Sequence, residues 1–497
     1  MRLTCAFALS RFETQCNSNS PRRRGTVAIR AISLGFALAA SALSFGQQGT
    51  WTAVTAPCPE SPETALLLTD GSVLFKSFSN YQHYFKLTPT NTYSYSPGTW
   101  SQLASAPNGV LYGPTEVLKD GRVFIAGGEY LTSGQTDHNT AEIYNPVTNT
   151  WTTCPDSLYS AIGDTGSSIL TDGRVICSNW SNSGTDIYNP TTNTWTAVAP
   201  LNTGTGDEAS WQILPDSSVL SVYSTAQRYI TSLNQWKNTP ALPTNLVDSA
   251  GEIGPLVYLY NGKAMIFGGC VNNGATALYT PPTTLTGNND SWALGPVIPG
   301  NYGAPDCPAC VETNGKVLFV ATPTVYGAPY FFEYDPSNGS VTQITGPNTN
   351  GTPSYTLRLL ALPNGRVLLS GVGTTVWLYT PTGAPQASWR ATLSSVVKNS
   401  DGSYTLSGTQ LNGLTNGASY GDECTPYTNY PIVTLQNTST GKYYFARSYN
   451  FTNMLFATGS ATVSTRFTLP AGIPSGTYSV MTSASGVWSS NTLSLSL

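Results

Sequence analysis

Two apolar runs separated by a tight polar turn recur seven times along the chain. The first two copies read LLLTDGSVLF (66–75) and EVLKDGRVFIAGG (116–128). The turn residues are Asp70, Asp120, Asp172, Asp216, Asn261, Asn314 and Asn364, spaced 44–53 residues apart. An Asx-Gly pair between apolar runs is a strong β-hairpin signal, because glycine accepts the positive φ that such turns need. The fourth copy keeps its place although Ser217 replaces the glycine.

A third run ending in tyrosine follows each hairpin, and in most copies a tryptophan comes after it. Examples are Tyr144 with Trp151 and Tyr188 with Trp195. Four strands per period, repeated radially, are typical of a β-propeller. Because these aromatic residues hold the same rank in every repeat, we interpret them as packing between blades.

The segment 49–54 (GTWTAV) resembles the tryptophan-bearing fourth strand, but it precedes the first hairpin. The seventh unit supplies only three strands, ending with 375–379. We therefore expect the N-terminal segment to complete blade seven and to pair two edges that would otherwise be exposed. The sequence thus predicts an all-β fold with a seven-bladed propeller over residues 47–384.

From residue 385 to residue 497 the pattern changes to short alternating strands separated by turns. The strands are expected at 391–397, 404–409, 431–436, 442–448, 463–469 and 477–482. About 110 residues of this type favour an immunoglobulin-like sandwich.

The first 46 residues have the composition of a targeting segment. Four arginines (Arg22, Arg23, Arg24 and Arg30) precede an apolar stretch over 31–45, which is too short for a membrane span and is followed by small residues. This order is typical of a secretory signal, so we expect the mature chain to begin near Gln47 and to be extracellular.

Without residues 1–46 the chain has 16 basic and 25 acidic residues, because that segment contains six Arg and one Glu. The mature part contains no cluster of Lys or Arg, which disfavours nucleic acid as a partner. It also contains no apolar run of membrane-spanning length. Seven cysteines remain, and for the Cys307–Cys310 pair we favour a disulfide over a zinc or redox site.

Several motifs resemble those of the kelch-repeat galactose oxidase-like family. They are Gly127-Gly128 and Gly268-Gly269 at strand ends, SWRATLSSV at the start of the C-terminal part, and SGTQLNGLTNGASYGDE (407–423). The resemblance implies a secreted kelch propeller followed by an early-set sandwich. It also implies copper-radical oxidation, with the copper held by two tyrosines and two histidines at the mouth of the central channel.

The ligand positions of that family match this chain only in part. Tyr112 and Tyr355 match the two tyrosines, whereas Thr356 stands where a histidine is expected. The sandwich histidine would fall near 446–449, where Tyr449 is the nearest candidate. The two histidines of the chain, His83 and His138, both follow second strands. Copper prefers imidazole ligands, so this pattern disfavours copper and copper-radical catalysis.

Acidic residues gather at the position eight residues before each turn. That position holds Pro62, Tyr112, Asp164, Glu208, Ile253, Asp306 and Thr356, and Glu63, Asp207 and Glu252 are immediate neighbours. Equivalent positions in a propeller converge on one axis. Three interpretations follow: local hydrogen bonds to backbone amides, a Ca²⁺ site, or contacts to sugar hydroxyls with Tyr112 and Trp211 as stacking surfaces.

The sequence favours a non-catalytic module that binds extracellular carbohydrate or a surface protein. Its candidate ligand-binding residues are Tyr112, Asp164, Glu208, Asp306, Tyr355 and Trp211, and Ca²⁺ is a candidate ligand. Two enzymes are the alternatives: a divergent oxidoreductase of the copper-radical type, and a carbohydrate-active enzyme that uses two carboxylates.

Overall fold

The computed structural model describes residues 48–132, 134–135, 137–349, 351–420 and 426–497. The expected signal segment and Cys424 lie outside these residues. The described chain is all-β, apart from the short 3₁₀ turns η1 (Thr231–Leu233), η2 (Pro299–Asn301), η3 (Ser354–Thr356) and η4 (Ala387–Trp389). No helix in these ranges is long and apolar enough to cross a membrane.

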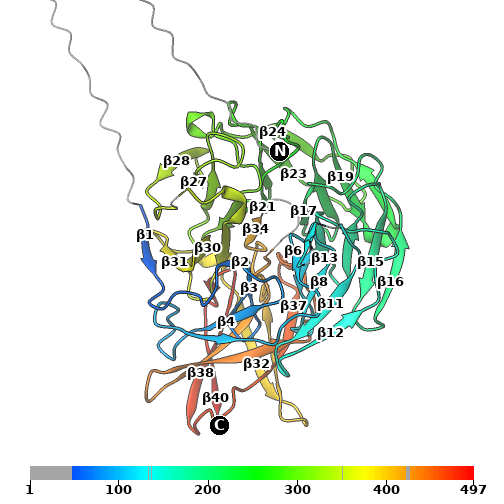
Figure 1. Cartoon of the computed structure of the whole chain (residues 1–497). Helices are drawn as coiled ribbons and strands as arrows, with labels where there is room; N and C mark the ends of the chain where they lie inside the picture. The colour runs from blue at the N-terminus through cyan, green and yellow to red at the C-terminus, as the bar shows by residue number, and fades with distance from the viewer. Residues whose placement is uncertain (1–47, 133, 136, 350, 421–425) are drawn as a thin grey trace, which may run out of the picture. The chain divides into compact units, whose positions relative to one another are not determined.

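Seven antiparallel sheets, each with four strands from the repeat, follow one another around a common centre (Figure 1). Blades 1 to 3 comprise β2 (Pro62–Leu67), β3 (Val73–Ser77), β4 (Tyr84–Thr88), β5 (Thr99–Gln102); β7 (Thr115–Val117), β8 (Val123–Ala126), β11 (Ala141–Asn145), β12 (Thr150–Cys154); β13 (Ser167–Ile169), β14 (Val175–Ser178), β15 (Thr185–Asn189), β16 (Thr194–Val198). Blade 2 also has a small neighbouring sheet of β6 (Val110–Leu111), β9 (Tyr130–Leu131) and β10 (Gly134–Gln135).

Blades 4 to 7 repeat the pattern and confirm the predicted propeller. They comprise β17 (Ser210–Ile213), β18 (Val219–Val222), β19 (Ala226–Ile230), β20 (Gln235–Asn238); β21 (Leu256–Tyr258), β22 (Ala264–Phe267), β23 (Thr276–Thr280), β24 (Ser291–Leu294); β25 (Pro308–Val311), β26 (Val317–Ala321), β27 (Tyr330–Asp335), β28 (Ser340–Ile344); β29 (Arg358–Ala361), β30 (Val367–Val372), β31 (Thr375–Thr380), β1 (Thr50–Ala53). In the last blade β1 pairs with β31, Thr50 opposite Thr380. The N-terminal strand therefore closes the ring, as expected.

Each innermost hairpin is held by its Asx residue. In all seven turns the side-chain oxygen of Asp or Asn accepts the backbone N–H two residues later, at 2.8–3.3 Å. The residue directly after the Asp or Asn has a positive φ, which glycine adopts without cost. In blade 4 this residue is Ser217, with φ 71°.

The aromatic residues of the outer strands join neighbouring blades. Tyr144 of β11 pairs with Trp151 of β12, with ring centroids 5.1 Å apart. The indole N–H of Trp151 donates to the carbonyl of Ala104, which follows β5 of the preceding blade, at 2.8 Å. The same bond recurs from Trp51 of blade 7 to the carbonyl of Thr345, which follows β28 of blade 6. These contacts support the interpretation of the aromatic residues as inter-blade packing.

The C-terminal part forms one curled, eight-stranded, sandwich-like sheet around its own core. Its strands are β32 (Thr392–Lys398), β33 (Tyr404–Thr409), β37 (Thr462–Thr468), β36 (Tyr443–Tyr449), β35 (Ile432–Asn437), β38 (Thr477–Ala484), β39 (Val487–Trp488) and β40 (Leu493–Ser496). Leu406, Val433, Leu435, Phe467 and Val480 are buried in that core.

A segment between β33 and β35 leaves this sheet and contacts the innermost strands of the propeller. Its strand β34 (Ala418–Tyr420) pairs with β25 of blade 6, which becomes five-stranded. Further hydrogen bonds join it to four other blades: Tyr430 to Leu67, Tyr427 to Ser168, Asn416 to Gln212 and Thr415 to Tyr258. The sequence did not predict this insertion.

The expected disulfide between Cys307 and Cys310 is wrong. Both thiols are buried and free, as are the other four described cysteines. Cys307 directly precedes β25 and Cys310 lies in it. Three steps along an extended chain span about 10 Å, well beyond the Cα separation that a disulfide allows.

Substitution of Ser217 by glycine should stabilise the protein by about 1 kcal/mol, because it removes the cost of a left-handed backbone at a non-glycine residue. The matched change Gly262→Ser, at the equivalent turn of blade 5 (φ 84°), should destabilise by a similar amount. Urea unfolding of both variants measures the two effects. If both variants were as stable as the wild type, the predicted cost of a left-handed backbone at a non-glycine residue would be wrong.

A second prediction concerns the buried carboxyl of Glu142 on β11, which accepts the backbone N–H of Asn108 at 3.1 Å. Burial raises its pKa from 4.5 to about 7. The folded state therefore binds more protons than the unfolded chain over this range, and stability falls as the pH rises from about 4.5 to about 7. In blade 4, Gln227 makes the equivalent bond to Asn202 at 2.8 Å. Glu142→Gln should keep the fold and flatten this part of the curve of unfolding free energy against pH; an unchanged curve would contradict it.

Candidate functional site

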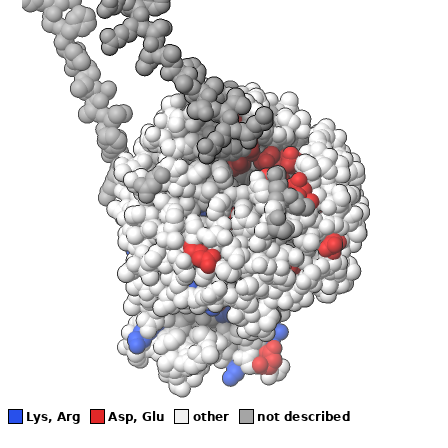
Figure 2. Space-filling view, in the orientation of Figure 1, with Lys and Arg blue, Asp and Glu red and all other residues white. Residues whose placement is uncertain are grey.

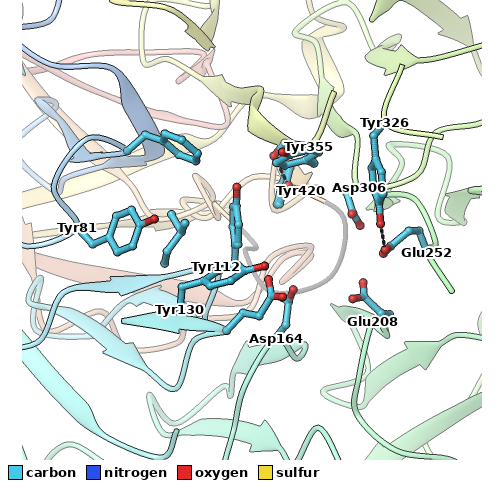
Figure 3. A pocket seen from close by; sticks show the side chains of 13 residues that line it. Tyr81, Tyr112, Tyr130, Asp164, Glu208, Glu252, Asp306, Tyr326, Tyr355 and Tyr420 are labelled. Atoms are coloured by element: carbon cyan, nitrogen blue, oxygen red, sulfur yellow. Dashed lines mark hydrogen bonds between the residues drawn. The ribbon is translucent and has the colours of Figure 1, made fainter. Parts of the chain in front are cut away.

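A pocket of about 440 Å³ opens at the mouth of the propeller, where the segments leading into the innermost strands converge (Figure 3). We call it the mouth pocket. It is lined by six tyrosines, five carboxylates and two apolar residues: Tyr81, Tyr112, Tyr130, Tyr326, Tyr355, Tyr420, Glu129, Asp164, Glu208, Glu252, Asp306, Phe78 and Leu111. None of these described lining residues is Lys, Arg, His or Cys.

Five of the six residues that the sequence singled out lie together in this pocket: Tyr112, Asp164, Glu208, Asp306 and Tyr355. Each stands two or three residues before an innermost strand, namely β7, β13, β17, β25 and β29. Residues of equal rank in different blades therefore face the same axis. Figure 2 shows acidic side chains gathered near the centre of the propeller face.

Three of these residues share an unusual backbone conformation. Tyr112, Glu208 and Asp306 have φ of 50°, 56° and 46°, and Tyr326 of the same pocket has φ 52°. Left-handed backbone is uncommon for non-glycine residues and clusters at binding and catalytic sites, because the surrounding structure must hold it. Because this conformation recurs at the equivalent position of three blades, we infer that the position does more than connect two strands.

The tightest group of acids comes from three consecutive blades. Glu208, Glu252 and Asp306 precede β17, β21 and β25, and one carboxylate oxygen from each lies within 4.8 Å of the other two. Glu252 is only 8% exposed, and its Oε1 accepts a hydrogen bond from the phenol of Tyr326. Burial, followed by this bond and by nearby carboxylates, raises the pKa of Tyr326 well above its ordinary value.

Four tyrosine rings continue from this group across the pocket. Ring centroids are 5.4 Å apart for Tyr326 and Tyr355, 6.2 Å for Tyr355 and Tyr112, and 6.0 Å for Tyr112 and Tyr130. Each pair meets edge to face. Burial and the neighbouring Glu129 raise the pKa of Tyr130 to about 12, so this ring stays a neutral phenol near pH 7. The pocket thus combines flat apolar rings with acceptor oxygens.

The inserted strand β34 supplies the pocket residue Tyr420. Its phenol donates to the carbonyl of Tyr355, and its ring lies under the guanidinium of Arg358, 3.3 Å from the ring centroid. Arg358 also donates to the Tyr355 carbonyl, at 2.7 Å. The backbone of Tyr355 is therefore fixed jointly by blade 7 and by the C-terminal part.

Arg358 belongs to a buried ion cluster at the seam between blades 7 and 1. Glu63 of β2 bonds Arg358 with one oxygen and Lys76 of β3 with the other, the latter at 2.8 Å, and all three side chains are about 1% exposed. Burial alone would raise the pKa of Glu63, but Lys76 and Arg358 outweigh it and hold the pKa at about 2. Glu63 thus has a structural partner and does not line the mouth pocket.

Among known sequence families, the kelch motif model matches residues 117–157, which cover blade 2. No curated protein sequence matches the chain. A solved fungal alcohol oxidase of the AA5 family, in complex with copper, is similar in structure with a TM-score of 0.55 and 14% identity, covering 91% of this chain and 100% of that one. Blade 2 thus carries a kelch motif, and the chain is similar in fold to that oxidase. A catalytically inactive virginiamycin B lyase from Staphylococcus aureus, solved with quinupristin, has a TM-score of 0.46 and 11% identity, covering 67% of this chain and 99% of that one.

The donors of this kelch-type propeller do not fit copper. The described lining residues offer carboxylate and phenol oxygens, whereas copper prefers imidazole or thiolate. His83 bonds Glu60 at 2.9 Å outside the pocket lining, and His138 is buried, which lowers its pKa to about 4. Cys58 is buried and free, and it does not line the pocket.

Two sequence expectations are corrected at this site. Trp211 lies within β17, is fully buried, and packs edge to face on Trp236, so no ligand in the mouth pocket can stack on it. Tyr449, the nearest candidate for the sandwich ligand, lies in β36 against Arg447, whose guanidinium bonds Asp120 at a hairpin turn. Tyr420 reaches the pocket instead.

Substitution of Glu63 by glutamine should destabilise the protein by about 3–5 kcal/mol at pH 7, because it leaves two buried cations without a counter-charge. The ion cluster stabilises the fold above the unfolded-state pKa of about 4.5, and this contribution is lost as the pH falls toward about 2. The unfolding free energy of the variant should therefore change less than that of the wild type as the pH falls through this range. The exposed pair Arg466–Asp401 is the control, and Asp401→Asn should leave the stability nearly unchanged.

Proposed function

We propose that this chain is a secreted protein that binds carbohydrate in the mouth pocket without chemically changing it. The observation that carries the proposal is the lining, which combines six tyrosine rings with five carboxylates and has no basic side chain among the described lining residues. Tyrosine presents a flat apolar face to the C–H groups of a sugar ring, and carboxylates accept its hydroxyl protons.

The size of the pocket agrees with this ligand class. Pockets for small molecules usually enclose about 300–1,000 Å³, and the mouth pocket, at about 440 Å³, has room for a short oligosaccharide end. A surface protein presenting such a glycan is the corresponding partner. Export is supported by the basic and apolar order of residues 1–46.

Binding should depend on Tyr326, which is 39% exposed at the pocket. Screening of the purified chain against neutral soluble oligosaccharides, followed by calorimetry on the best ligand, measures the affinity. Tyr326→Ala should weaken it about tenfold, as expected for a lost stacking face worth roughly 1.4 kcal/mol. Tyr330→Ala, equally exposed at 38% but outside the pocket lining, is the matched control and should bind like the wild type.

The same samples distinguish a binding protein from an enzyme. Hydrogen peroxide formed from a sugar alcohol would identify an oxidase, and reducing ends released from an oligosaccharide would identify a hydrolase. Either product, formed in proportion to protein and lost in Glu208→Gln, would overturn the non-catalytic assignment. Binding without either product supports it.

A further inference from the structure

Glu208, Glu252 and Asp306 bring three carboxylates from three blades to one point of the mouth pocket. One oxygen of each lies within 4.8 Å of the other two. Figure 3 shows the three side chains pointing toward one another on one side of the pocket. Three like charges this close repel one another.

The second observation is the state of the Glu252 carboxylate. This side chain is more than nine-tenths buried, and its Oε2 has no hydrogen-bond partner, while its Oε1 accepts from Tyr326. A buried carboxylate oxygen without a donor or a cation is costly. Local hydrogen bonds to backbone amides, one of the interpretations open from the sequence, do not satisfy this atom.

We propose that Glu208, Glu252 and Asp306 bind a calcium ion. A cation at their centre would offset the repulsion and satisfy Glu252 Oε2. Two oxygens on one calcium ion can lie up to about 5 Å apart, because calcium–oxygen distances are about 2.3–2.6 Å; magnesium, at about 2.1 Å, reaches only about 4.2 Å. Oxygens that lie within 4.8 Å of one another can therefore share one calcium ion, and calcium tolerates an irregular set of oxygen ligands where magnesium demands a near-ideal octahedron.

The ion would also have a role toward a ligand, and this second step rests on the proposed carbohydrate binding. Calcium takes six to eight oxygen ligands, more than three carboxylates supply if each binds through one oxygen. The remaining positions face the mouth pocket, since all three residues line it. Two adjacent hydroxyls of a sugar are suitable oxygen ligands, while Tyr326 and Tyr355 provide the apolar contact.

Calorimetric titration of the chelator-treated full chain with Ca²⁺ alone tests the metal site, without any sugar present. We expect one calcium ion per chain and a rise in unfolding temperature with Ca²⁺, because a ligand of the folded state stabilises it. Glu252→Gln should lose both effects. Asp156→Asn, which removes an exposed carboxylate outside the pocket, should keep both.

Folding of the variants is checked in EDTA. Glu252→Gln should unfold there at the temperature of the wild type or above it, since one of three repelling charges is gone. Asp306→Asn is the second variant, with the same expectation. A wild-type chain that binds no Ca²⁺, or a Glu252→Gln chain that binds it as tightly as the wild type, would overturn the site.

Sugar binding with and without EDTA then separates the two proposals. Loss of sugar binding in EDTA and its return with Ca²⁺ supports a bridging ion. Sugar binding that is equal in EDTA keeps the proposed function and overturns the bridging role. Calcium binding without binding of any sugar keeps the metal site and overturns the proposed function.

Discussion

The structure depends on closure of the ring. A row of blades with free ends would expose one strand edge of blade 7 and the bare face of blade 1. Strand β1 (Thr50–Ala53), the first strand of the folded part, pairs with β31 and so covers the exposed edge of blade 7. The buried Lys76–Glu63–Arg358 cluster lies at the same seam. A buried charge that loses its partner destabilises the fold, so this cluster is stable only when blades 7 and 1 are in contact.

Closure has a consequence for chemistry. Once seven similar blades surround one axis, a residue type that recurs at one rank is concentrated at one point. Glu208 and Asp306 are 98 positions apart in the chain, yet their carboxylates lie within 4.8 Å. The same convergence brings Tyr112 and Tyr355 into ring contact. The fold thus converts a weak sequence periodicity into a dense group of acids and phenols, whatever ligand they bind.

This explains which parts of the site could be predicted. The Asx turns and the closing strand depend on local chemistry and on counting repeats, and both were predicted correctly from the sequence. The rank of Tyr112, Asp164, Glu208, Asp306 and Tyr355 follows from the same count. Trp211 was misplaced because a count along the chain does not tell which face of β17 a side chain takes.

Other parts could not be read from any local pattern. Glu252 was visible only as a neighbour of Ile253, and its importance comes from burial and from the phenol of Tyr326, which a separate loop supplies. Tyr420 comes from a segment whose sequence resembles a part of the sandwich. Its pairing with β25 is a long-range contact, and no spacing in the sequence specifies it.

That segment gives the C-terminal part a structural reason to share a chain with the propeller. Strand β34 and its flanks bond the innermost strands of five blades, so they occupy the channel that a ring of seven blades would leave along its axis. Tyr420 at the end of this strand is both a wall of the mouth pocket and a donor to Tyr355. The pocket is therefore formed by both parts together. The blades supply the acids, and the inserted strand limits the depth of the pocket and fixes Tyr355. A propeller without this segment would have the same acids around an open channel, which has no wall against which a small ligand could be held.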